Sequence, residues 1–359
     1  MRLISLDKLT DEMVLAKSLY DSRGTLILPA GTELKEYKEQ IAPFNIHYLL
    51  VEDEVSQGIE VPILLSDETR LEVHEAMRRA TVFLKPVEDY KKKTFFTLPY
   101  TKVAWRIAED IYALNDTRID VTELAMNKVM PNYHCLNVAI LATLIGRLFE
   151  LPLNALFHLC MGGFLHDIGM LAVPEEVLEK IGTGKMSQTD IHIYRQYPAM
   201  GFDMIKHNQA LDLITKSAVF QHMERYDGNG FPSHKTGEET TLAAKIMAIA
   251  DTFDTLHNGL RIDGLKPMKI YEIIEFIQNN SGTAYDPDVV DVFVNNAQVF
   301  PNGTMVKLSN GCKGIVVNQN HNLMTRPIVR ITHSAEGKIE FGMVNLLEDM
   351  SLVVDDIEL

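Results

Sequence analysis

Three histidines and two aspartates in this chain are the side chains best suited to bind a divalent ion. They are His134, His166, Asp167, His222 and Asp251. His166 and Asp167 are adjacent, and adjacent helical side chains do not face one partner, so both reach a single ion only where a helix ends. We expect Gly169 to end that helix by taking a positive φ. A capping histidine beside a solvated aspartate would explain the same pair without any ion.

Asp251 lies in the apolar stretch of residues 246–251. A carboxylate buried in such a stretch costs several kcal/mol unless it is paired or bound to a metal. One explanation is a buried aspartate paired with a histidine. The other is that two or three imidazoles and two carboxylates converge on one ion, a mixed nitrogen and oxygen donor set that suits Fe, Mn or Zn. The spacing of the residues leaves both explanations open.

The composition excludes several classes of protein. The chain has 359 residues, of which 46% are hydrophobic, enough for a globular protein of two or three domains. Its 34 basic and 49 acidic residues give a net charge of −15, which argues against DNA or RNA as a partner. The longest apolar run, residues 136–145, is far shorter than the ~20 residues of a membrane span. We therefore expect no membrane partner.

The cysteines and the first residues indicate the compartment. The three cysteines, Cys135, Cys160 and Cys312, are an odd number at unrelated spacings, which favours reduced thiols. The first residues contain no apolar core of a signal peptide. We expect a cytoplasmic protein.

The hydrophobic periodicity predicts a multidomain protein with a central all-α bundle between two smaller modules. We expect an N-terminal α+β module over residues 1–62, a helical connector over 63–114, a helical domain over 115–300 and a C-terminal β domain over 301–359. The expected helices cover residues 101–114, 121–129, 136–151, 155–167, 188–208 with a break at Pro198, 213–226, 242–256, 268–279 and 287–296. The expected C-terminal strands cover residues 305–308, 314–318, 328–332 and 338–341.

Four sequence blocks of the central region resemble the HD-GYP family. They are His134, HDIG at 166–169, HMERYDGNGFP at 222–232 and IADTFDTL at 249–256. The family comprises metal-dependent cyclic-di-GMP phosphodiesterases within the wider HD hydrolase superfamily. The resemblance covers residues 115–300 and implies that His134, His166, Asp167 and Asp251 are the four ligands of a first ion. It also implies that His222 is the first histidine of the family's HHE block, which serves a second ion.

Several positions depart from the family pattern. Met223 replaces the second histidine of the HHE block, and Tyr197 replaces the histidine before Pro-x-x-Gly. Met130 stands where some members place a glutamate for a third ion, and Met170 replaces the lysine of HDIGK. Leu260, Arg261 and Ile262 replace the later R-P-Y. The second ion keeps only the shared Asp167 and His222, so we expect one ion rather than two.

The resemblance and these departures together predict a function in bacterial cyclic-dinucleotide signalling. We expect a degenerate HD-GYP-type domain that binds a metal, and a cyclic dinucleotide such as cyclic-di-GMP or another small phosphate ligand, with low turnover. Arg225, Lys245 and Arg261 are the expected phosphate contacts. A protein partner would bind through the N- or C-terminal module, and a second copy of the chain is a further expected partner. The alternative is an active metal-dependent cyclic-di-GMP phosphodiesterase or phosphohydrolase.

Overall fold

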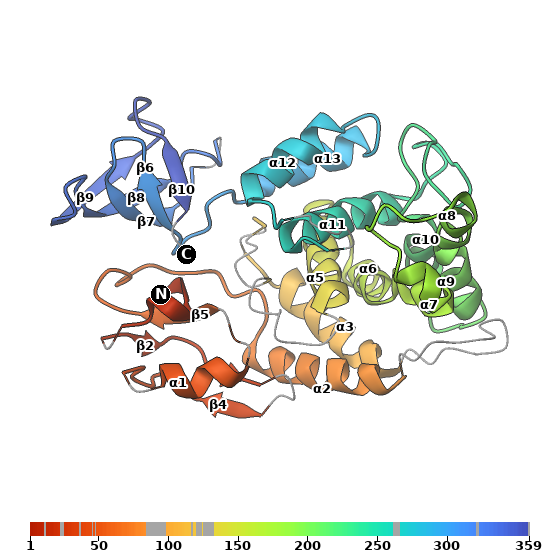
Figure 1. The fold of residues 1–359 in the computed structure, drawn as a ribbon, viewed down its shortest axis with the longest axis horizontal. Coiled ribbons are helices and arrows are strands. Elements are labelled where there is room, and N and C mark those ends of the chain that lie inside the picture. The colour runs from red at the N-terminus through yellow and green to blue at the C-terminus, as the bar shows by residue number, and fades with distance from the viewer. Residues whose placement is uncertain are drawn as a thin grey trace. The chain divides into compact units, whose positions relative to one another are not determined.

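The computed structural model divides the chain into two compact units. The first unit comprises Met1–Leu64, Arg118–Pro131 and Asn295–Leu359, and the helical unit comprises Leu65–Thr117 and Asn132–Val294. Within these units the structure describes residues 1–10, 12–21, 25–35, 37–44, 46, 48–83, 98–115, 118–119, 124, 133–260, 266–320 and 323–357. Figure 1 colours the elements in chain order. The division into four segments expected from the sequence remains a prediction.

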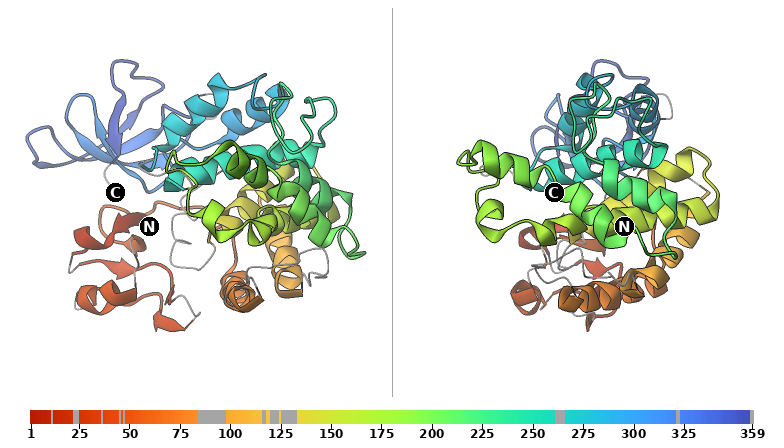
Figure 2. Two further views of the ribbon diagram at one scale, coloured as in Figure 1. Left: turned by 45° about the vertical axis from the view of Figure 1, so that its right-hand side comes forward. Right: turned by 90° about the vertical axis from the view of Figure 1, so that its right-hand side faces the viewer.

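The helical unit is a bundle in which α5 and α6 lie at the centre (Figure 1). Figure 2 shows the same bundle from two other directions. Its elements are α2 Asp67–Phe83, α3 Leu98–Tyr112, α5 Tyr133–Leu148, α6 Leu153–Leu165, the 3₁₀ turn η5 Ile168–Ala172, α7 Glu175–Leu178, α8 Gln188–Tyr194, α9 Tyr197–Ile205, α10 Leu213–Gln221, α11 Leu242–Asn258, α12 Ile270–Asn279 and α13 Pro287–Asn296.

Helices α5 and α6 form the core because small residues let their backbones approach closely. A Cβ atom on Gly163 would overlap the backbone of Ala139. Among the described residues one helical stretch, Leu153–Ala172, is long and apolar enough to cross a bilayer, but 78% of its apolar window is buried inside the protein. Burial of this kind is the ordinary environment of a core helix, so the stretch is weak evidence for a membrane span.

The turn that follows α6 differs from its prediction. Helix α6 ends at Leu165, and His166 is its C-cap in right-handed helical geometry, with φ −54° and ψ −37°. Gly169 lies inside η5 and is not among the glycines with positive φ, so the prediction that it ends the helix in that way was wrong. The glycine is required for a different reason, because a Cβ at position 169 would overlap the carbonyl oxygen of Tyr197.

The described residues of the first unit form three antiparallel sheets, which come from two distant parts of the chain. The N-terminal part forms the sheet β1-β5-β2 and the hairpin β3-β4, and the C-terminal part forms the sheet β10-β6-β7-β8-β9. The elements are β1 Arg2–Ser5, β2 Val14–Leu15, β3 Leu19–Tyr20, β4 Leu26–Leu28, α1 Lys38–Ile41, β5 Tyr48–Glu52, β6 Met305–Leu308, β7 Lys313–Asn318, β8 Ile328–His333, β9 Ile339–Asn345 and β10 Val354–Ile357. Arg330 of β8 donates hydrogen bonds to the carbonyl oxygens of Val55 and Gln57 at 3.3 and 2.7 Å, which joins the two parts.

The predicted fold class is confirmed in its coarse form, with a mostly helical central region, N-terminal strands and a C-terminal sheet. The helix over 287–296 is confirmed at both ends, whereas the helix predicted over 213–226 ends at Gln221. Strand β10 was missed. The helix predicted over 121–129 lies mostly outside the described residues.

Candidate metal centre

Four elements of the helical unit bring the predicted ligands together. His134 is in the first turn of α5, His166 and Asp167 follow the last residue of α6, His222 caps the end of α10, and Asp251 lies in the middle of α11. His166, His222 and Asp251 are buried, with 0%, 2% and 6% exposure. Helix ends and one helix face therefore supply all five side chains, which explains how adjacent His166 and Asp167 point to the same place.

The donor atoms of four of these residues lie close to one another. His134 Nε2 is 3.1 Å from Asp251 Oδ1 and 3.8 Å from Asp167 Oδ2. His166 Nε2 is 3.7 Å from Asp251 Oδ1 and 3.5 Å from Asp167 Oδ2. Bonds of about 2.1 Å to one ion place neighbouring ligand atoms about 3 to 3.5 Å apart. The spacing and the mixed nitrogen and oxygen donors thus fit a divalent ion such as Fe, Mn or Zn.

The three imidazoles are oriented by hydrogen bonds from their other ring nitrogen. Nδ1 of His166 lies 2.8 Å from the carbonyl oxygen of Gly163, and Nδ1 of His222 lies 3.0 Å from that of Val219. A carbonyl oxygen only accepts, so Nδ1 carries the proton in both rings and Nε2 keeps its lone pair. This is the state in which an imidazole binds a metal.

Nε2 of His222 contacts a side chain that is not among the predicted ligands. The Tyr197 hydroxyl lies 2.7 Å from His222 Nε2, which in turn is 3.9 Å from Asp167 Oδ1. Burial, with Tyr194 and Asp251 nearby, raises the pKa of Tyr197 well above its usual value, so the phenol stays protonated and donates a hydrogen bond to this nitrogen. Burial and the neighbouring His166 lower the pKa of His222 to about 3.

Two of the positions that depart from the family pattern pack beside Tyr197. Tyr197, Val173 and Val177 form a buried cluster, and Met170 and Met223 are partly buried against it. Thioethers are soft ligands that a hard ion does not favour, and aliphatic groups are not ligands. The methionine and valine side chains around Tyr197 therefore offer no good ligand for a second hard ion.

Comparison with known proteins assigns the family. Residues 114–289 match the family model described as "HD domain". A cyclic di-GMP phosphodiesterase of Pseudomonas aeruginosa is 29% identical over 206 residues, which cover 57% of this chain and 49% of that protein. Residues 114–289 are an HD domain.

Two further comparisons concern a second curated phosphodiesterase and a solved structure. A 3′3′-cGAMP-specific phosphodiesterase of Vibrio cholerae is 25% identical over 168 residues, which cover 46% of this chain and 31% of that protein. A solved HDG"Y"P protein of Bdellovibrio bacteriovorus superposes with a TM-score of 0.48 at 14% identity, over 82% of this chain and 98% of that one. The chain spans about half or less of the length of the two curated relatives.

A cavity of about 550 Å³ in the HD domain opens beside the predicted ligands. His222 and Asp251 line it together with aromatic and cationic side chains, among them Tyr194, Arg195, Arg225, Phe231 and Tyr285. Arg225 also binds Asp227, at 3.0 Å, and this contact lowers the pKa of Asp227 to about 2. Arg225 thus lines the cavity, and its role as a phosphate contact remains a prediction.

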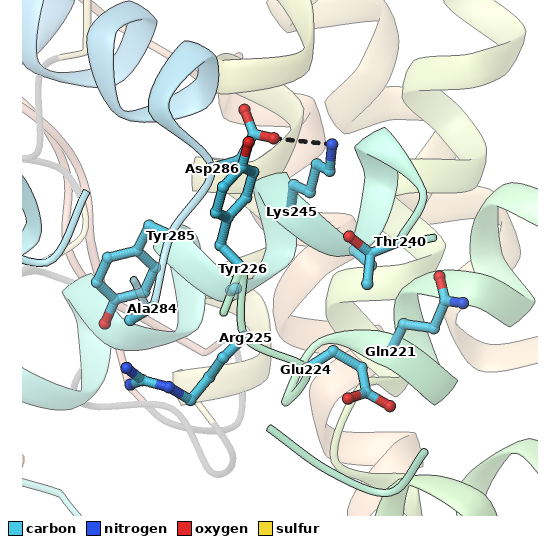
Figure 3. A pocket seen from close by; sticks show the side chains of 11 residues that line it. Gln221, Glu224, Arg225, Tyr226, Thr240, Lys245, Ala284, Tyr285 and Asp286 are labelled. Atoms are coloured by element: carbon cyan, nitrogen blue, oxygen red, sulfur yellow. Dashed lines mark ion pairs between the residues drawn. The ribbon is translucent and has the colours of Figure 1, made fainter. Parts of the chain in front are cut away.

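The other two predicted phosphate contacts are not placed there. Figure 3 shows a second, smaller pocket, where Lys245 forms an ion pair of 2.8 Å with Asp286. Lys245 does not line the larger cavity. Arg261 lies outside the described residues. Of the two predicted phosphate contacts that the structure describes, Arg225 lines the cavity with His222 and Asp251 and Lys245 does not.

Sequence reasoning missed one carboxylate of the HD domain site. Asp254, one helical turn after Asp251 on α11, lies 2.7 Å from His134 Nδ1. It is 1% exposed. The spacing of three residues between the two aspartates was the available signal, because it places both on one face of a helix.

Proposed function

We propose that this HD-GYP protein binds one divalent ion through His134, His166, Asp167 and Asp251, and that it binds a cyclic dinucleotide with low turnover. The ion supplies Lewis-acid stabilisation of charge that develops on a phosphoryl oxygen. His222 borders the site without holding a second ion. The chain then acts in the bacterial cytoplasm as a receptor or scaffold, with a partner protein or a second copy bound through the flanking modules.

The observation that carries the proposal is the hydrogen bond between Tyr197 and His222. At 2.7 Å the phenol satisfies the Nε2 lone pair that a second ion would need. Asp167 would then be the only other ligand that the family pattern leaves for that ion. Met223 and Met170, which pack against the cluster around Tyr197, offer no replacement ligand. A single ion is therefore the arrangement that these side chains support best.

The cavity supports a cyclic dinucleotide as the ligand. Aromatic rings such as Tyr194, Phe231 and Tyr285 offer faces on which a nucleobase can stack, and Arg225 offers a cation for a phosphate. Relatives are named for cyclic di-GMP and for 3′3′-cGAMP. These two points support a cyclic dinucleotide as the class of ligand.

Metal content and hydrolysis test the proposal together. Elemental analysis of the protein, after incubation with Mn, Fe or Zn and removal of excess ion, should give one ion per chain. Cyclic-di-GMP should bind, and conversion to its linear form should be slow. The double variant Tyr197→His with Met223→His should bind a second ion. Two ions and rapid turnover in the wild type would overturn the proposal.

An active phosphodiesterase that uses one ion is the second candidate. The observation in its favour is that the cavity is lined by Asp251 and His222, so that a bound phosphate would reach the proposed ion. Robust hydrolysis at one ion per chain would establish this function. Loss of that hydrolysis in Asp251→Asn would show that it arises from this site.

A further inference from the structure

Asp254 is the acceptor for three side chains in the interior of the helical unit. His134 Nδ1 lies 2.7 Å from Asp254 Oδ2. Asn137 Nδ2 and Asn258 Nδ2 donate to Asp254 Oδ1 at 2.7 and 2.9 Å. An ionised carboxylate only accepts hydrogen bonds, so each of these partners must present a hydrogen to it. The two amides point their NH₂ groups at Asp254, and His134 points its Nδ1–H.

The arrangement determines which ring nitrogen of His134 has a lone pair. With its proton on Nδ1, the neutral ring has its lone pair on Nε2. Nε2 lies 3.1 Å from Asp251 and 3.8 Å from Asp167, on the side where the proposed ion binds. Asp251 and Asp254 are therefore one turn apart on α11 and contact opposite edges of the same imidazole.

We propose that Asp254 is the positioning residue of this metal site, which holds His134 in the Nδ1–H tautomer so that Nε2 binds the ion. The inference rests on the metal site of the proposed function. Asp254 does not contact the ion and acts through His134. Partners of this kind typically change metal affinity by about 10- to 100-fold.

The substitution Asp254→Asn turns one acceptor oxygen into an NH₂ donor and leaves the volume nearly unchanged. The new amide has one oxygen, whereas Asn137 and Asn258 present NH₂ groups on one side and His134 presents Nδ1–H on the other. The oxygen should face the two amides, because that orientation keeps two hydrogen bonds whereas the opposite one keeps only one. The new NH₂ group then faces His134 Nδ1 and forces its proton to Nε2. Zinc affinity should then fall by about 10- to 100-fold or more.

A swap of the two side chains should restore the tautomer. In the double variant Asp254→Asn with Asn137→Asp, the carboxylate at position 137 accepts from the new amide, whose oxygen then faces His134. Asn258 still has the backbone oxygen of Asp254 as an acceptor, at 3.0 Å. The total charge equals that of the wild type. The swap should regain most of the zinc affinity that the single variant loses.

The test uses the full chain, with zinc as the probe. Zinc affinity is measured by competition with a chromophoric chelator, and long-range ¹H–¹⁵N NMR of zinc-loaded and zinc-free protein at alkaline pH reports which His134 nitrogen carries the proton. Asp190→Asn is the matched control, because Asp190 is also a buried carboxylate but caps α8 and pairs with Lys180. This control should leave zinc affinity and the His134 signals unchanged.

The outcomes separate this inference from the proposed function. If Asp254→Asn has the zinc affinity and the His134 signals of the wild type, the positioning role is wrong. If that variant does not fold, the wild type decides, because a zinc-loaded His134 with its proton on Nε2 also overturns it. A wild type that binds no zinc contradicts the proposed function instead. Loss of affinity with recovery in the swap supports the inference, since damage to packing alone would not be repaired by a second substitution.

Discussion

Asp251 is the side chain whose replacement separates a metal ligand from a structural ion pair. Burial opposes its ionisation, but the imidazoles of His134 and His166 hold the pKa of Asp251 well below its usual range. We predict that Asp251→Asn folds and loses most of its metal affinity, because coordination requires the anionic oxygen. Melting temperatures are measured with and without chelator. Chelator should destabilise the wild type and barely affect the variant.

An unchanged metal content in Asp251→Asn would mean that Asp251 is not a ligand. If Asp251 serves only as the partner of a histidine, the substitution leaves metal content unchanged and lowers stability by a few kcal/mol, because a buried charge loses its partner. Chelator would then have the same effect on both proteins. That result would remove Asp251 from the proposed ligand set.

His222 should make the metal-free protein sensitive to mild acid. Its pKa is about 3 in the folded protein, against about 6.5 in an unfolded chain, so the unfolded state binds more protons between these values. The stability that His222 contributes is fully present above about pH 6.5 and is lost as the pH falls toward 3. From pH 7 to pH 5 the loss from this residue is about 2 kcal/mol.

Urea unfolding of chelator-treated protein at pH 7 and pH 5 measures the loss of unfolding free energy that His222 causes. The wild type should lose about 2 kcal/mol more than His222→Gln, whose amide oxygen still accepts from Tyr197 but does not titrate. Equal losses in the two proteins would show that His222 is charged, or exposed, in the folded state.

The sequence allowed prediction of the side chains that converge but not of all their partners. His134, His166, Asp167 and Asp251 were found because charged or basic groups in apolar helices are unusual. The role of Tyr197 was not found, since its hydrogen bond to His222 joins residues 25 positions apart and follows no local pattern. Whether the converging residues hold an ion remains a prediction.

The backbones of the turn η5 and helix α9 pack directly against each other at Gly169 and Gly201. A Cβ on Gly169 would overlap the carbonyl oxygen of Tyr197 and lie 2.7 Å from the backbone nitrogen of Gly201. We predict that Gly169→Ala lowers the free energy of unfolding by about 2 kcal/mol or more, because backbone atoms cannot move aside as a side chain does. The displacement should also weaken the contact between Tyr197 and His222.

Chemical denaturation measures the change, and Gly342→Ala in β9 is the control. A Cβ at position 342 has no atom within 4 Å, so this substitution should change stability by less than about 0.5 kcal/mol. If Gly169→Ala also changes stability by less than about 0.5 kcal/mol, α9 and η5 are farther apart than described.

Helix ends were predictable where the signal is local. Asp286 accepts hydrogen bonds from the backbone nitrogens of Asp288 and Val289, and Pro287 begins α13, so both the cap and the first residue are visible in the sequence. The end of α10 at Gln221 was missed because the next turn is held by Glu224, which accepts from the backbone nitrogens of Ser233 and Lys235. Contacts of this range are not encoded in periodicity.

At the scale of the molecule, the first unit combines segments that are far apart in the chain. Arg330 links β8 to the carbonyl oxygens of Val55 and Gln57. We predict that Arg330→Met, which keeps the aliphatic stem, destabilises this unit by about 1–2 kcal/mol. The zinc affinity of the helical unit should not change.

The single tryptophan allows the unfolding of the helical unit to be followed separately from that of the first unit. Trp105 lies in α3 of the helical unit and stacks on Phe157, with ring centroids 4.3 Å apart. Its fluorescence should report the same unfolding midpoint in Arg330→Met and in the wild type, whereas circular dichroism should detect an earlier loss of strand signal. Lys338→Met, which removes only an exposed ion pair with Glu336, should leave both signals unchanged. A shift of the fluorescence midpoint in Arg330→Met would show that the two units unfold together.

The order of synthesis has a consequence for this unit. A ribosome releases the chain from its N-terminus, so residues 1–64 emerge long before residues 295–359, which complete the same compact body. The helical unit between them can fold during that interval. The strands of residues 1–64 meanwhile expose the surface that residues 295–359 later cover. Newly made chains that stop after the helical unit should therefore be the ones that chaperones hold and proteases remove.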